Sequence, residues 1–131
     1  MELAMRTSKF FRFTISGDNL DLEVLKNTIG LRGETYVKGD VVYKLSEAIP
    51  QKTNRWVYHS EHIDEESVSA FLTENLEILV SDLTVIKAFA KTNDTKIELV
   101  VYAGDNTDIC LTPCQIQLLD KLGIDFYISF C

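Results

Sequence analysis

The feature that most constrains this fold is a regular alternation of apolar and polar residues in three separate segments. In residues 9–16, every second side chain from Phe11 to Ile15 is apolar. Residues 96–103 and 124–131 repeat the same period of two. Because successive side chains of a β-strand point to opposite faces, each segment is expected to form a strand with one buried face and one open face.

A long amphipathic segment supplies the cover for such a sheet. From residue 66 to residue 91, apolar side chains recur three and four positions apart, and polar residues line the opposite side. Ser81 and Asp82, in the middle of this segment, form a good capping pair, so we expect either a bend there or two consecutive helices. Asp64 is expected to cap the start.

Two shorter helices are indicated by the residues at their ends. Asp21 is a typical capping residue, and Gly30 is a C-terminal stop for the helix that follows it. In residues 112–115, Thr, Pro and Gln stand at the N-cap, the first and the third positions of a capping box. The helix that begins there is expected to end at Gly123.

The middle of the chain predicts a hairpin. Residues 34–38 and 41–46 are rich in residues that favour β-strands. The two residues between them, Gly39 and Asp40, are typical of a tight two-residue turn. Residues 47–54 are expected to form a loop.

A further strand is expected over residues 55–59. In this strand Trp56 and Tyr58 share one face, while Arg55 lies on the other. We expect Trp56 to point toward the helices, because a lone tryptophan is more often part of the core than of a contact surface. A brief strand is also expected at residues 108–111.

These elements predict an α+β fold, a two-layer sandwich of one mostly antiparallel sheet with its helices on one face. The chain has 131 residues, of which 46% are apolar, which suits a single domain over residues 1–131 with one core. Phe13, Leu76 and Phe126 stand at the centres of the apolar faces of their elements. We therefore expect these three side chains to be buried together.

Charge is unevenly distributed along the chain. Residues 1–60 carry nine Lys or Arg against seven Asp or Glu, a net +2, whereas residues 61–131 carry four against thirteen, a net −9, which together give −7. Nucleic acid and anionic membranes both attract clustered Lys and Arg, so this balance argues against either as a partner. It leaves open a basic protein partner, a cationic ligand or ordinary solubilising charge.

The three cysteines are an odd number in a chain large enough to hold a core without disulfides. Cys110 and Cys114 lack the two-residue spacing of redox pairs, so we expect free, buried, structural thiols. The N-terminal residues lack the apolar run of a secretory signal, and no apolar stretch reaches the roughly 18 residues that span a bilayer. A cytoplasmic location is expected.

Several short motifs follow one another in a distinctive order along the chain. They are Ser16-Gly17 after the first strand, Ile29-Gly30-Leu31 after the first helix, Lys38-Gly39-Asp40, Trp56 on a strand, and Leu119 to Gly123 before the aromatic last strand. This order resembles a bacterial family known as domain-of-unknown-function family 4279. The resemblance implies a small cytoplasmic α+β domain with no assigned reaction. Some small acidic families of this kind are suspected to act as immunity or protein-binding modules.

His59 and His62, with Glu61 and Asp64 beside them, suggest a metal site. Zinc needs three or four ligands that converge with fixed geometry. Positions three apart on a strand point to opposite faces, so the two histidines converge only if the chain turns at Ser60. We therefore expect no metal, and the lack of a glycine-rich phosphate loop predicts no cofactor.

Aromatic and basic side chains gather on adjacent predicted strands. Arginine and aromatic residues bury large areas at low entropic cost and dominate binding hot spots. We expect a binding or interaction domain whose partner is another protein or a second copy of the chain. The alternatives are a small hydrolase or transferase, or aromatic residues that only cover the sheet. The candidate contact residues are Tyr36, Lys38, Asp40, Arg55 and Trp56.

Overall fold

The computed structural model describes residues 7–39, 41–44, 47–50, 53–64, 67–102 and 110–130. The fold is α+β, as predicted. In chain order its elements are β1 (Thr7–Gly17), α1 (Leu22–Thr28), β2 (Glu34–Tyr36), β3 (Val41–Lys44), β4 (Glu47–Pro50), β5 (Asn54–Asp64), α2 (Val68–Val80), α3 (Leu83–Ala90), β6 (Asp94–Tyr102), α4 (Pro113–Leu122) and β7 (Asp125–Phe130).

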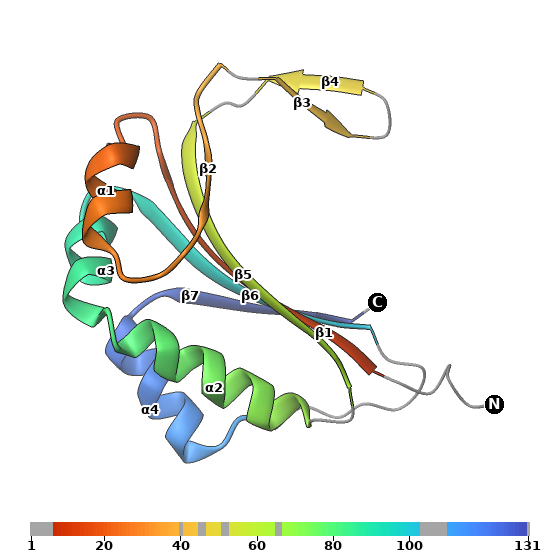
Figure 1. Ribbon diagram of the computed structural model, residues 1–131. Helices are drawn as coiled ribbons and strands as arrows, with labels where there is room; N and C mark the ends of the chain where they lie inside the picture. The colour runs from red at the N-terminus through yellow and green to blue at the C-terminus, as the bar shows by residue number, and fades with distance from the viewer. Residues whose placement is uncertain are drawn as a thin grey trace.

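The main sheet has five strands in the order β2-β5-β1-β6-β7. The pairs β2–β5, β5–β1 and β1–β6 are antiparallel, and only β6–β7 is parallel. The parallel pair follows from the connection, because α4 lies between β6 and β7 in the chain and carries it back to the same end of the sheet. Strands β3 and β4 pair with each other in a separate two-stranded ribbon (Figure 1).

The central strand, β1, separates the two faces of the sheet. Phe11, Phe13 and Ile15 are fully buried on its inner face, as the alternation predicts. In the register, Phe13 lies opposite Tyr58 on one side and Ile97 on the other. The apolar rows therefore continue from strand to strand across the sheet.

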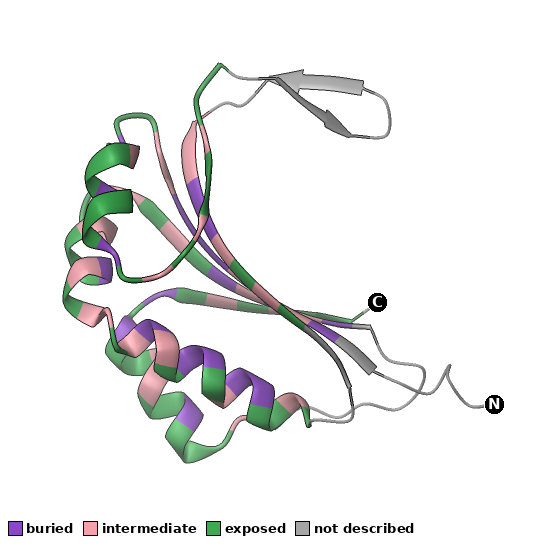
Figure 2. Ribbon diagram, in the orientation of Figure 1, coloured by how far each residue is buried: buried purple, intermediate pink, exposed green. Residues whose placement is uncertain are grey.

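All helices of the described chain lie on one side of this sheet, and the other side is left open (Figure 1). The buried stripes of α2 face the sheet, while its far side is exposed (Figure 2). Phe13 and Leu76 are fully buried in the shared core, as expected. Phe126 packs against that core but is only half-buried, because β7 is an edge strand.

The long helical segment divides into two helices, as its capping pair predicts. Helix α2 ends at Val80 and α3 begins at Leu83. The carboxylate of Asp82 makes no cap to α3 and instead accepts a hydrogen bond from the backbone N–H of Gly30 at 3.0 Å. The prediction that Asp64 caps the segment is wrong: β5 extends to Asp64, and Ser67 caps α2.

The two short helices begin at the predicted caps, and α4 also ends as predicted. Helix α1 ends at Thr28 with Ile29 as an extended C-cap, so Gly30 follows this end without forming a left-handed glycine stop. Asp21 accepts a hydrogen bond from the backbone N–H of Val24 at 3.1 Å. The capping box of α4 is complete, and Gly123 ends this helix in the left-handed conformation with φ 64°. Gln115 also lies in the core, where its side-chain Nε2 is 3.0 Å from Ser69 Oγ and so ties α4 to α2.

The predicted hairpin between residues 34–38 and 41–46 does not form. β2 pairs with β5, β3 pairs with β4, and residues 47–50 form a strand rather than a loop. Gly39 has φ 95°, as a turn residue would, but this local signal carries no information on long-range pairing. β2 pairs beside Trp56 of β5, and Gly33, just before β2, lies close against the Trp56 ring. Residues 45 and 46 lie outside the described part.

Two smaller predictions near α4 also need correction. Cys110 and Cys114 are exposed, not buried: Cys110 precedes α4, and Cys114 lies on the solvent side of its first turn, while Gln115 takes the buried side. Cys131 lies outside the described residues. Of the strand expected at 108–111, only residues 110 and 111 are described, and they belong to no strand. No described helix is long and apolar enough to cross a membrane.

The contact between Gly33 and Trp56 gives a test of this pairing. A Cβ atom at Gly33 would lie 2.3 Å from Trp56 Cε2, so Gly33→Ala should lower the free energy of unfolding by about 1–3 kcal/mol. In a Trp56→Phe background the same change should cost less than about 0.5 kcal/mol, which a double-mutant cycle by chemical denaturation measures.

Gly39→Ala is the matched control for this cycle. Its Cβ would meet no atom within 4 Å, so it should cost only backbone strain, on the order of 1 kcal/mol, with or without Trp56→Phe. An equal cost of Gly33→Ala in both backgrounds would contradict the packing of β2 over Trp56.

Candidate functional site

The open face of the sheet carries the side chains that point away from the helices. At one end, β1, β2 and β5 surround a hollow of about 270 Å³. We call it the arginine hollow. Its lining residues are Phe10, Arg12, Glu34, Tyr36, Arg55, Val57 and His59.

The strand register brings these residues together. Arg12 on β1 lies opposite His59 on β5, and Tyr36 on β2 lies opposite Arg55. Each pair points away from the core because its neighbours in the chain point inward. The hollow thus joins positions that are far apart in sequence.

Tyr36 and Arg55 were expected in the contact surface, and both line the hollow. Trp56 points toward the helices, as expected. It is only 1% exposed, so it is part of the core. Lys38 lies outside the hollow, where its Nζ is 3.8 Å from Asp18 Oδ1. Asp40 lies outside the described residues.

Four residues of the hollow were not identified from the sequence, namely Phe10, Arg12, Glu34 and Val57, and His59 was considered only as a metal ligand. Phe10 and Arg12 occupy outer positions of β1. The alternation of residues 9–16 in the sequence does predict that these two side chains point away from the core. Their meeting with Glu34 and His59 depends on the pairing of β2, β5 and β1. No local motif encodes that pairing.

A line of contacts begins at Arg55. The guanidinium carbon of Arg55 lies 4.7 Å from the centre of the Tyr36 ring, within cation–π distance. The Tyr36 hydroxyl donates to Glu34 Oε2 at 3.1 Å. The other carboxylate oxygen of Glu34 is 2.7 Å from His59 Nε2. Both oxygens of Glu34 are therefore engaged.

The line continues through aromatic rings to β6. The His59 ring stacks on Phe10, with centroids 5.6 Å apart and an interplanar angle of 11°. Arg12 lies over the same Phe10 ring at 5.1 Å. Arg12 also approaches Glu98 at 3.4 Å, where Lys96 is a second cation at 3.8 Å. Glu98 is thus shared between two positive charges.

Arg55 differs from the other charged groups of the hollow. Within the described part of the chain it has no ion pair and no hydrogen bond, and its Nε is closed off from solvent without an acceptor. A buried donor without a partner costs about 1–3 kcal/mol, more when the group is charged. The Arg55 guanidinium therefore keeps unused capacity for a planar anion.

The polar contacts shift two pKa values. The hydrogen bond from His59, with a smaller effect from Tyr36, lowers the pKa of Glu34 below its ordinary value of 4.5. Partial burial and then the hydrogen bond to Glu34 raise the pKa of Tyr36 above 10.0. Glu34 is therefore ionised and Tyr36 is neutral near pH 7.

The arginine hollow offers guanidinium donors and one pair of groups that could exchange a proton. His59 and Glu34 form a pair that could move a proton, but the lining residues include no serine, threonine or cysteine to serve as a nucleophile. The metal alternative needs a turn at Ser60, and β5 continues as one strand through Ser60 to Asp64. The described residues contain no cluster of three potential metal ligands.

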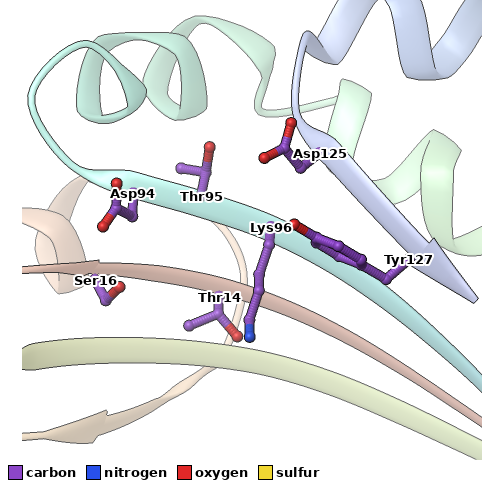
Figure 3. Close-up of a pocket in the computed structure, with 7 residues that line it drawn as sticks. All are labelled: Thr14, Ser16, Asp94, Thr95, Lys96, Asp125 and Tyr127. Carbon is purple, nitrogen blue, oxygen red and sulfur yellow. The ribbon is translucent and has the colours of Figure 1, made fainter. Parts of the chain in front are cut away.

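A second hollow, of about 300 Å³, lies on the same face over β1, β6 and β7. In Figure 3 the Lys96 side chain runs between Thr14 and Tyr127, with Asp94 and Asp125 near the rim. Its charges are mixed in sign, and we call it the polar hollow. Its lining residues are Thr14, Ser16, Asp94, Thr95, Lys96, Asp125 and Tyr127.

The lowered pKa of Glu34 is open to direct measurement. By carbon-13 NMR titration, the Glu34 carboxyl should titrate below 4.5, and His59→Gln should move it upward because the largest cause is removed. The contribution of this carboxylate to stability is complete above pH 4.5 and is lost as the pH falls through its lowered folded-state pKa.

Tyr36→Phe is the control for the Glu34 titration. It removes the smaller hydrogen bond and should move the pKa of Glu34 upward by less than His59→Gln does. A wild-type Glu34 that titrates at its ordinary value would contradict the contact with His59.

Comparison with known proteins identifies the family. Neither a search of curated proteins nor a search of solved structures returned a match. The family described as a domain of unknown function (DUF4279) matches residues 6–130, nearly the whole chain. This agrees with the resemblance in its short motifs, and the chain belongs to the DUF4279 family.

Proposed function

We propose that this chain is a binding domain that receives an acidic segment of a partner protein in the arginine hollow. Arg55 takes the carboxylate, and Tyr36 holds the guanidinium in place from one side. The observation that carries the proposal is the unpaired Arg55 guanidinium at an otherwise satisfied site.

The charges around the hollow favour an anion. Glu34 is the one acidic residue among the seven that line it, and both of its oxygens are held by His59 and Tyr36. Arg12 is only partly neutralised, because Glu98 is 3.4 Å away and is shared with Lys96. A carboxylate entering the hollow would meet two guanidinium groups, of which Arg55 has no competing anion.

The composition of the hollow favours a protein segment over nucleic acid. Two arginines are too few for the counterion release that drives binding to phosphate chains, and the whole chain has a net charge of −7. Arginine with tyrosine and phenylalanine is the combination typical of protein hot spots. An immunity role would be one form of such binding.

The experiment uses a blocked triglutamate peptide as the probe and follows the Arg55 Nε–H signal by nitrogen-15 NMR. We expect a saturable shift of this signal. Arg55→Gln should weaken peptide binding at least about tenfold, or about 1.4 kcal/mol, because the carboxylate loses its planar partner. Binding should also weaken between about 50 mM and about 500 mM NaCl.

Lys87→Gln is the matched control, since it removes one positive charge from the last turn of α3, on the covered side of the sheet. It should leave peptide binding within about twofold of wild type. Equal losses in both variants, or no shift of the Arg55 signal at saturating peptide, would refute the proposal. Inorganic phosphate is the second probe, and binding as tight as the peptide's would assign the hollow to a free anion.

A further inference from the structure

The edge strand β7 is a second surface of interest, independent of the arginine hollow. In the described part of the chain β7 pairs only with β6, so its other edge has no strand beside it. The opposite edge of the sheet is β2, which has only three residues. An unpaired edge presents backbone N–H and C=O groups that another strand can satisfy.

The sequence of β7 lacks the features that usually protect an edge. Five consecutive residues, from Phe126 to Phe130, carry no charge and no proline. Tyr127 and Phe130 are 53% and 58% exposed, which makes them two of the five large apolar side chains exposed on the described surface. Exposed apolar side chains, Phe130 on the covered face and Tyr127 on the open face, beside free backbone groups favour strand pairing.

The same strand is complementary to itself. In an antiparallel pair centred on Ile128, each residue lies opposite one of the same parity, so the two faces of the sheet stay in register. Phe126 of one copy then lies opposite Phe130 of the other, and Ile128 lies opposite Ile128. Tyr127 lies opposite Ser129 on the open face. Aromatic and β-branched residues in such cross-strand pairs are stabilising.

We propose that β7 pairs with β7 of a second copy of this chain, antiparallel and centred on Ile128, and joins the two sheets into one. Charge places the contact at this edge. Each copy carries −7, so association is opposed over most of the surface, and β7 brings only Asp125, at the outer end of the paired region. The interface is small, so we expect a dimer that dissociates in the micromolar range.

Sedimentation equilibrium from about 1 µM to about 1 mM tests the proposal. We expect a monomer–dimer equilibrium that strengthens as NaCl rises from about 50 mM to about 500 mM, because salt screens the repulsion between the two acidic copies. Phe130→Glu should weaken the dimer at least about tenfold, because two carboxylates would each face a Phe126.

Ile116→Glu on α4 is the matched control. Ile116 is 53% exposed, so the change adds the same charge to a similarly exposed apolar position away from the edge, and it should leave the dimer within about twofold. Circular dichroism checks that both variants fold. If Phe130→Glu fails to fold, Tyr127→Glu, on the open face of the same strand, takes its place.

Hydrogen exchange gives the residue-level readout. The β7 amides that face away from β6 should exchange more slowly at high protein concentration in the wild type, and not in Phe130→Glu. A chain that stays monomeric at about 1 mM and high salt overturns the proposal. So does a dimer that Phe130→Glu leaves intact or that Ile116→Glu weakens equally, because a different surface would then hold the two copies.

Discussion

Everything in this structure depends on β1 being paired along both of its sides. It pairs with β5 from Thr7 to Gly17 and with β6 from Ser8 to Ser16. A strand held on both sides cannot slip by one residue, because a slip would move every apolar side chain to the open face. The pairing therefore fixes which residues form the core and which line the arginine hollow.

The one-sided cover of the sheet explains where the polar network lies. The helices bury the inner rows, so side chains such as Phe11 and Leu99 meet apolar neighbours and leave no room for unpaired charge. On the open face, water satisfies charged groups that have no other partner. Arg55 departs from this pattern, because its Nε is enclosed and still lacks an acceptor. This unsatisfied donor is the observation on which the proposed binding of an acidic segment rests.

Much of the fold was predictable, because the decisive signals are local. The alternation of residues 9–16, the break of the long helical segment at Ser81 and Asp82, and the capping box of α4 each depend on neighbours in sequence, and each was confirmed. The prediction of a hairpin was wrong, because it inferred from the turn signal at Gly39 that β2 and β3 pair with each other. β2 instead pairs with β5, where Thr35 lies opposite Trp56, a residue far along the chain.

The candidate site was predictable only in part, for the same reason. Tyr36 and Arg55 stand out by residue type, so composition alone brought them forward. In the sequence Arg12 looks like an ordinary solvent-facing residue and His59 suggests only a metal ligand, whereas the register places the two opposite each other. Glu34 becomes informative only through its contacts with His59 and Tyr36. A site whose residues are brought together by strand pairing can be predicted from one sequence only when the pairing of the strands can be predicted too.

The two proposed surfaces are compatible because they lie at opposite ends of one sheet. The arginine hollow lies over β2, β5 and β1, and the dimer would form through β7, so association leaves the hollow open. A two-fold axis perpendicular to the joined sheet keeps both hollows on the same face. From β5 of one copy to β5 of the other is seven strand spacings, roughly 34 Å at about 4.8 Å each. A partner with two acidic segments that far apart would engage both hollows, and its second contact would gain from the high effective concentration that the first one creates.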